Sequence, residues 1–153
     1  MMITEEQIGG FLKKWQDILR LRDWDIKPVL VTRNWRKSGD VKIDRDNHMA
    51  AVMIHDSTDP AHLEEVVVHE LLHLKLYGMD QLLEETINIL FGSDDSDPKK
   101  EFAMNTFFLE LESTVEDLTK AMLTAHGRQT DFWFKRVDRQ IEEELRSREV
   151  ASE

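Results

Sequence analysis

Cysteine is absent from the sequence. This excludes disulfide bonds and thiolate metal sites, so a metal ion would have to be held by histidine and carboxylate side chains. No apolar run is long enough to cross a bilayer, and residues 1–6 lack the basic-then-apolar order of a signal peptide. We therefore expect a cytoplasmic protein without membrane contact.

Positive charge is also scarce. The chain has 20 Lys and Arg side chains against 31 Asp and Glu, which gives a formal net charge of −11. Sequence-independent binding of nucleic acid depends on clustered basic residues, so nucleic acid is not an expected partner. Two local basic segments, residues 33–37 and 128–139, are interpreted most simply as solvated surface.

The length of 153 residues fits one domain that spans the whole chain. A helix is expected to begin near Thr4, because residues 4–7 form a capping-box pattern. Three short β-rich segments follow, at residues 26–32, 41–44 and 50–54. Their connections are too short for helical crossovers, which predicts a small, mostly antiparallel sheet.

The second half is expected to be helical. One helix should begin at Asp59 and end near Tyr77, with Gly78 as its stop, and a shorter helix should cover residues 81–91. Residues 92–98 form a loop whose Asp and Ser residues do not match the spacing of a calcium loop. Two amphipathic helices follow, at residues 101–123 and 130–148, before a frayed tail at 149–153. The last helix is expected to dock through Phe134, Val137, Ile141 and Leu145.

The sequence His69-Glu-Leu-Leu-His73 is the motif that carries chemistry. On a helix, two histidines four residues apart project from one face, so their imidazoles can reach one zinc ion. Glu70 lies about 100° around the helix from His69, where a carboxylate can take a proton from water without binding the metal. The motif can also arise by chance, but it is flanked by apolar residues, and two imidazoles at the edge of a core need partners.

A catalytic zinc ion needs a third protein ligand. The extended metzincin motif is excluded, because Leu76 and Met79 stand where that motif requires Gly and His. On the helix predicted at 101–123, Glu112 lies nearest the apolar stripe among the acidic residues and is the favoured ligand. The alternatives are that Glu112 is a solvated helix-edge carboxylate, or that Glu116 replaces it. Glu116 could otherwise accept a hydrogen bond from a ligating histidine.

On these residues the chain resembles the gluzincin clan of zinc peptidases, and in particular the compact minigluzincin-like proteins of microbial and phage genomes. The resemblance covers residues 4–123 and implies an α+β, zincin-like fold. It implies one zinc ion per chain held by His69, His73 and Glu112, with Glu70 as general base and then general acid. It also implies that residues 50–54 form the edge strand that pairs with an extended peptide substrate.

The chain departs from the family pattern in three respects. Residues 74–111 form a longer spacer between the motif and Glu112 than in thermolysin-like enzymes, and the large helical lower subdomain is missing. No oxyanion-stabilising residue is obvious, although Tyr77 and His126 are candidates. His48, His55 and His62 are interpreted as surface histidines or as partners of the ligands.

Three functions are therefore compared. The leading hypothesis is a zinc metallopeptidase, a hydrolase that cuts peptide bonds in a peptide or protein substrate. The second is a zincin-fold binding or regulatory protein with little or no turnover. The third is a zinc-stabilised structural domain, in which His126 would complete a closed four-ligand site.

Overall fold

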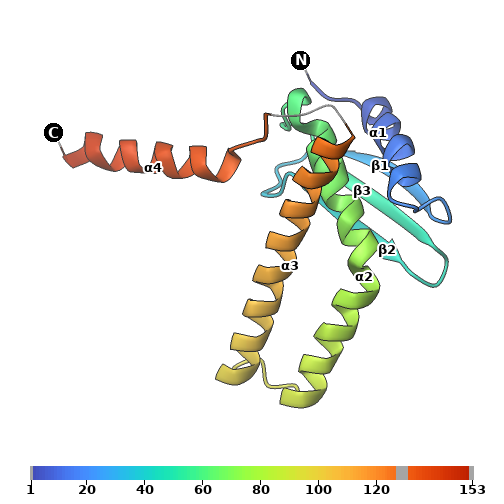
Figure 1. Ribbon diagram of the computed structural model, residues 1–153. Helices are drawn as coiled ribbons and strands as arrows, with labels where there is room; N and C mark the ends of the chain where they lie inside the picture. Colours follow the sequence, from blue (N-terminus) through green and yellow to red (C-terminus); the bar gives the residue numbers. More distant parts are fainter. Residues whose placement is uncertain (1, 127–130, 152–153) are drawn as a thin grey trace.

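The computed structural model of the protein describes residues 2–126 and 131–151, and it has an α+β fold (Figure 1). The elements follow one another as α1 (Glu5–Ile18), β1 (Asp25–Val31), β2 (Gly39–Asp44), β3 (Met49–His55), the short 3-10 helix η1 (Pro60–His62), α2 (Leu63–Phe91), α3 (Pro98–Ala125) and α4 (Lys135–Ala151). None of the described helices is long and apolar enough to cross a membrane.

The first helix begins where its capping box predicts. The Thr4 backbone N–H donates to the Gln7 side chain at 2.9 Å, and the Gln7 backbone N–H donates to the Thr4 hydroxyl at 3.2 Å. These two bonds satisfy donors that the first turn of a helix otherwise leaves free. The prediction for this helix is confirmed.

The sheet is mixed, so the prediction of a mostly antiparallel sheet is correct for only one of its two strand pairs. Its order is β1-β3-β2, with β3 antiparallel to β2 but parallel to β1. No helix is needed for the parallel pair, because β2 and its two flanking loops together carry the chain from the end of β1 to the start of β3. As a result β3, which was expected at the edge, is the central strand, and β2 is an edge strand.

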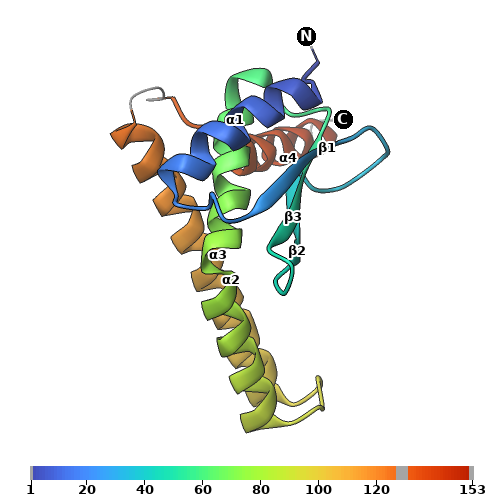
Figure 2. The ribbon, with the colours of Figure 1, turned by 90° about the vertical axis from the view of Figure 1, so that its right-hand side faces the viewer.

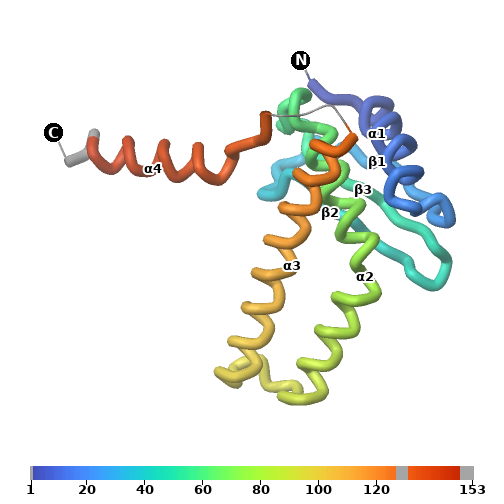
Figure 3. The backbone as a smooth tube through the Cα atoms, in the orientation of Figure 1, coloured from blue at the N-terminus to red at the C-terminus, as the bar shows by residue number. Residues whose placement is uncertain are grey.

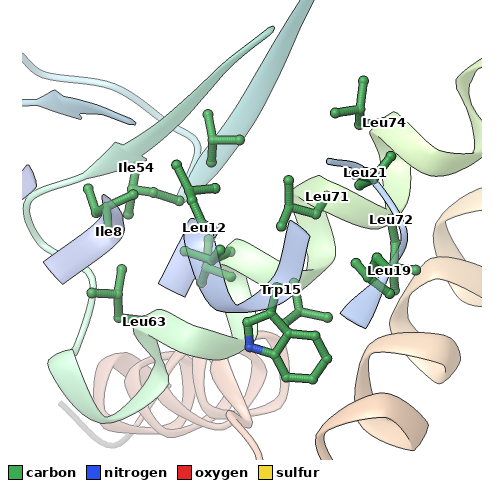
Figure 4. Close-up of a cluster of buried hydrophobic side chains, with 14 of the residues drawn as sticks. Ile8, Leu12, Trp15, Leu19, Leu21, Ile54, Leu63, Leu71, Leu72 and Leu74 are labelled. Atoms are coloured by element: carbon green, nitrogen blue, oxygen red, sulfur yellow. The ribbon is translucent and has the colours of Figure 1, made fainter. Parts of the chain in front are cut away.

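The core lies between the sheet and helices α1 and α2 (Figure 4). The side chains of Ile8 and Trp15 on α1 are fully buried, as are those of Ile54 on β3 and Leu71 on α2. The Trp15 indole N–H donates to the Glu64 carboxylate at 2.8 Å, and Lys14 contacts the same oxygen at 2.6 Å. A buried carboxylate with these two partners ties α1 to the first turn of α2.

Helix α2 is one continuous helix of 29 residues, which corrects the prediction of two helices separated at Gly78. Glycine ends a helix when it adopts a left-handed conformation. Among the described glycines only Gly92 has a positive φ, of 79°, and it is the residue that follows the end of α2. Asp59 and Pro60 do begin the segment as predicted, although the first turn is 3-10.

Helices α2 and α3 form an antiparallel pair that extends well beyond the sheet (Figure 2). The sheet and α1 cover only the part of α2 near its N-terminus. Beyond them, large apolar side chains of the hairpin are exposed, among them Leu82, Ile89, Leu90, Phe102 and Leu109. The part of the hairpin that carries the histidine motif is therefore its well-packed part.

The docking predicted for the last helix is wrong. Helix α4 projects away from the rest of the protein (Figure 3), and the four residues expected to dock, Phe134, Val137, Ile141 and Leu145, are all exposed. The periodicity correctly indicated an amphipathic helix, but it contains no information about a partner surface. The helix begins at Lys135 and runs to Ala151, into the expected frayed tail. The predicted start at Thr130 and residues 152–153 lie outside the described residues.

We predict that Gly78→Ala stabilises the protein by about 0.5–1 kcal/mol, because alanine is the better residue inside a helix. An added Cβ would meet nothing closer than the Arg45 guanidinium at 3.8 Å. Gly92→Ala is the matched control and should destabilise by about 1 kcal/mol, because its backbone is left-handed. Urea unfolding of both variants measures the change, and a loss of stability in Gly78→Ala would contradict the continuous helix.

Candidate metal centre

The two motif histidines lie one turn apart on the face of α2 that is turned toward α3. Both side chains are half-buried, and their Nε2 atoms lie 3.2 Å apart. The neighbouring α2 residues Val68, Leu71, Leu72 and Leu74 are buried, and the exposed edges of the two rings line the cleft. The helical spacing thus directs two imidazole nitrogens to one point, as the sequence predicted.

Glu112 reaches that same point from α3. One carboxylate oxygen lies 3.1 Å from Nε2 of His69, and the other lies 3.2 Å from Nε2 of His73. A tetrahedral zinc site with bonds of about 2.0–2.1 Å separates its ligand atoms by roughly 3.3 Å. The two Nε2 atoms lie close to that spacing, and one ligand atom from each of His69, His73 and Glu112 lies within 4.8 Å of the others, so the three residues form a group that could hold a metal ion.

Glu116 contacts the other nitrogen of His69. Its carboxylate lies 3.1 Å from Nδ1, one helical turn beyond Glu112 on α3. An imidazole that donates its Nδ1 proton to a carboxylate keeps the lone pair of Nε2 free for a metal ion. The structure therefore places Glu112 at the candidate ligand position and Glu116 behind His69. Glu110 and Asp117, the neighbouring acidic residues, are exposed.

The carboxylates make this point of the protein strongly attractive to a cation. Burial alone would lower the pKa of His69, but hydrogen bonds with Glu112 and Glu116 outweigh burial and raise that pKa to about 10. The same bonds hold the pKa values of both glutamates below their usual range. A divalent ion would satisfy this charge at least as well as a proton on His69 does.

Glu70 lies beside the group and does not belong to it. Its side chain is only 7% exposed, and burial raises its pKa to about 7 against the opposing influence of His69 and His73. No hydrogen-bond donor among the described residues contacts its carboxylate. The chain is brought close to it at Gly39, where a Cβ atom would lie 3.0 Å from a carboxylate oxygen. Glycine is required there to let β2 pass over Glu70.

The group opens into a cleft of about 890 Å³. Its floor is formed by α2 and α3, one wall by β2 and the loop before it, and the opposite wall by residues 132–137. Tyr77, a candidate oxyanion donor, lines this cleft. The candidate centre is therefore accessible to a molecule larger than water.

The wall at residues 132–137 was not expected from the sequence. The Trp133 backbone N–H donates to the Glu65 carboxylate at 3.2 Å, and the Trp133 ring stacks on His62 with centroids 5.4 Å apart. Farther along, the Lys135 ammonium contacts the Ser38 hydroxyl across the cleft. The two basic segments, interpreted as solvated surface, could have indicated this wall. Both segments contribute side chains to the cleft. Arg128 lies outside the described residues.

The remaining histidines lie away from the metal group. His126 packs edge-on against Trp15 at 5.7 Å and does not line the cleft, so the structure does not bring it to the fourth ligand position. His48 stacks on Trp24, and His55 bonds to Ser57 and to the Arg33 carbonyl. The interpretation as a surface residue is confirmed for His48, whose side chain is 51% exposed, whereas the His55 side chain is only 15% exposed.

No protein-family model, curated protein or solved structure matches this chain. The similarity to gluzincins therefore depends on the motif residues themselves. The geometry of the cleft and its side chains is the basis for the function proposed below.

We predict one divalent metal ion per chain, lost in His73→Ala and in Glu112→Ala, because each removes one of three ligands. Glu116→Gln should retain the ion with roughly 10- to 100-fold weaker affinity, since it contacts a ligand and not the metal. Glu110→Gln, exposed on the same helix, is the control and should bind like the wild type. Elemental analysis and competition with a chelator measure these effects, and full metal content in Glu112→Ala would exclude that residue as a ligand.

We also predict that Gly39→Ala destabilises the protein by about 1–3 kcal/mol. The new Cβ would lie 2.9 Å from the Val66 side chain and 3.0 Å from the Glu70 carboxylate, so buried groups must shift. Gly10→Ala is the control, because its Cβ would meet no atom within 4 Å. Thermal unfolding compares the two variants. Equal stability of Gly39→Ala and wild type would show that β2 does not approach Glu70 this closely.

Proposed function

We propose that the protein is a zinc-dependent metallopeptidase of gluzincin type that cuts peptide bonds in its cleft. The observation that supports this most strongly is the convergence of His69, His73 and Glu112 at one point, with a buried Glu70 next to it and a large opening in front. Three ligands with an open fourth position are typical of catalytic zinc sites, whereas structural sites are closed by four protein ligands.

Zinc is the metal that these side chains suit best. Two imidazoles and one carboxylate are a common ligand set for catalytic zinc, and a chain without cysteine has no softer donors. When bound, the ion would polarise the peptide carbonyl and make water more acidic. The carboxylate of Glu116 would keep the His69 ring oriented toward it.

Glu70 is the residue that would move the protons. Its carboxylate can accept a proton from a water molecule in the cleft and then donate it to the departing amine nitrogen. A general base works best when its pKa is close to the working pH, and burial raises the pKa of Glu70 to about 7. Tyr77 lines the cleft one helical turn beyond His73, so its hydroxyl is the candidate donor to the developing oxyanion.

Strand β2 is the element that would hold the substrate. Within the described residues its one partner strand is β3, so backbone groups on its other edge can pair with an extended peptide, although the Val41 N–H already donates to the Asp40 carboxylate at 2.9 Å. Residues 39–41 and 43 of this strand line the cleft. The role that the family resemblance assigned to residues 50–54 therefore passes to β2, because those residues belong to the central strand.

The alternative is a binding or regulatory protein that keeps the metal but turns over slowly. The wall at residues 132–137 favours it, because the Lys135–Ser38 contact spans the cleft and Arg136 lies 4.0 Å from Glu112. A wall held in this position would restrict substrate entry. A structural zinc domain is less favoured, since His126 lies outside the cleft.

We expect the zinc-loaded protein to hydrolyse fluorescein-labelled casein, and Glu70→Gln to lower the rate by roughly 10²- to 10⁴-fold while leaving zinc content and unfolding temperature unchanged. The amide has nearly the size of the carboxylate but cannot accept the proton. Glu85→Gln, exposed on the same helix, is the control and should keep full activity. A zinc-loaded wild type that cuts neither casein nor a mixed peptide library would favour the binding protein.

A further inference from the structure

Six basic side chains line the cleft, although the protein as a whole carries a formal charge of −11. They are Arg36, Lys37, Lys120, Lys135, Arg136 and Arg139. The lining also contains six carboxylates, so basic and acidic side chains are equal in number here, whereas the whole chain has 20 Lys and Arg against 31 Asp and Glu. Basic residues gathered at one opening of an acidic protein can create a local field that attracts a negatively charged ligand.

Four of the six basic residues belong to the two walls, and Arg139 follows the second wall on α4. Arg36 and Lys37 precede β2, whereas Lys135, Arg136 and Arg139 begin α4. The two walls are joined, because Lys135 contacts Ser38 and its ammonium lies 4.8 Å from the Trp133 ring centroid. Trp133 is in turn anchored to Glu65 on α2. The basic walls are thus held in place around the opening.

Six carboxylates also line the cleft, and each is buried or has a partner. Glu112 and Glu116 contact the histidines on the floor, Glu65 accepts from the Trp133 backbone N–H, Asp80 accepts from the Gln81 amide, and Glu70 is buried. Asp40 forms ion pairs with Lys42 and with Lys37, which is itself one of the six basic residues.

Among the described residues no carboxylate lies within ion-pair distance of Arg36 or Arg139. The crowding of positive charge is also evident at Lys135, whose pKa is lowered by burial and then by Arg139 and Arg136. Within the part of the chain that the structure describes, Arg36 and Arg139 are thus the cleft arginines without a protein carboxylate, and a ligand could supply one.

We propose that the cleft selects peptide segments that carry aspartate or glutamate side chains close to the bond to be cut. Arg36 and Arg139 are the residues that would bind those carboxylates, by charge-assisted hydrogen bonds from their guanidinium groups. The inference depends on the proposed peptidase function for the cut bond, but the binding preference can be measured without cleavage. An acidic peptide is favoured over nucleic acid, because the strongly negative remainder of the protein would repel a long polyanion.

The edge strand explains how such a segment would be presented. A peptide paired with β2 lies extended, with alternate side chains on opposite faces and about 6.5–7 Å between side chains on one face. The segment before β2 carries Arg36, and the start of β2 passes Glu70 at Gly39. An acidic side chain within two or three residues of the cut bond would therefore lie near the basic walls.

The test uses three fluorogenic peptides that are identical except for two residues flanking the cut bond, which are both Glu, both Gln or both Lys. We expect the wild type to cut the Glu peptide with a kcat/KM about 10-fold higher than the Gln peptide, mainly through a lower KM, and the Lys peptide least. The preference should weaken as salt screens the charges. It should disappear in Arg36→Gln/Arg139→Gln and persist in the control Arg146→Gln, on the same helix outside the cleft.

Binding of the same peptides to zinc-loaded Glu70→Gln, followed by fluorescence anisotropy, separates this inference from the proposed function. Equal binding or equal cleavage of the Glu and Gln peptides overturns the acidic preference and leaves the peptidase proposal intact. Preferential binding of the Glu peptide without cleavage by the wild type overturns the peptidase proposal and supports the acidic-peptide site. A single-stranded oligonucleotide of equal charge that binds more tightly than the Glu peptide overturns the assignment of the ligand as a peptide.

Discussion

The burial of the first three turns of α2 is the constraint on which the rest of the structure depends. On one side this segment packs on α1 and the sheet, and on the other it packs on α3. Most polar side chains in these turns have a partner inside the protein, whereas Glu70, whose carboxylate contacts no donor among the described residues, has its pKa raised by burial. Glu64 accepts hydrogen bonds from Lys14 and Trp15, and Glu65 accepts one from the Trp133 backbone. The motif histidines contact the carboxylates of α3. The candidate site is therefore one of several places on α2 where a buried polar side chain is paired with a group from another element.

The elements that depend on local sequence were predictable, and those that depend on distant contacts were not. The Thr4 capping box, the three β segments and the helical spacing of the histidines all follow from neighbouring residues. Glu112 could be chosen because its distance from an apolar stripe is also a local property. In contrast, the order of the strands and the partner of α4 are set by residues far apart in the chain. Gly78 illustrates the same limit, since composition alone cannot show whether a glycine adopts a left-handed conformation.

The basic segments are mostly exposed, as predicted, but their position around the cleft was not predicted, for a related reason. A charged stretch in a sequence usually lies on solvated surface, and exposure alone would support that interpretation for Arg136, whose side chain is 78% exposed. What distinguishes these cations is their position relative to one another across the cleft. That position is created by the Trp133 contacts with Glu65 and His62, which involve residues about 70 positions apart. Nothing in the local sequence around Trp133, which lies between α3 and α4, indicates that its ring will stack on His62.

The two walls of the cleft come from distant parts of the chain. The sheet provides one wall, through β2. The opposite wall comes from the chain after α3, where Trp133 lies against the N-terminal part of α2. Trp133 attaches this wall to α2 through a backbone hydrogen bond to Glu65 and a stacked ring pair with His62, and Phe132 and Trp133 both pack against the core. The wall of the cleft and the histidine motif therefore depend on the same buried turns of α2, so a change in the packing of those turns affects both.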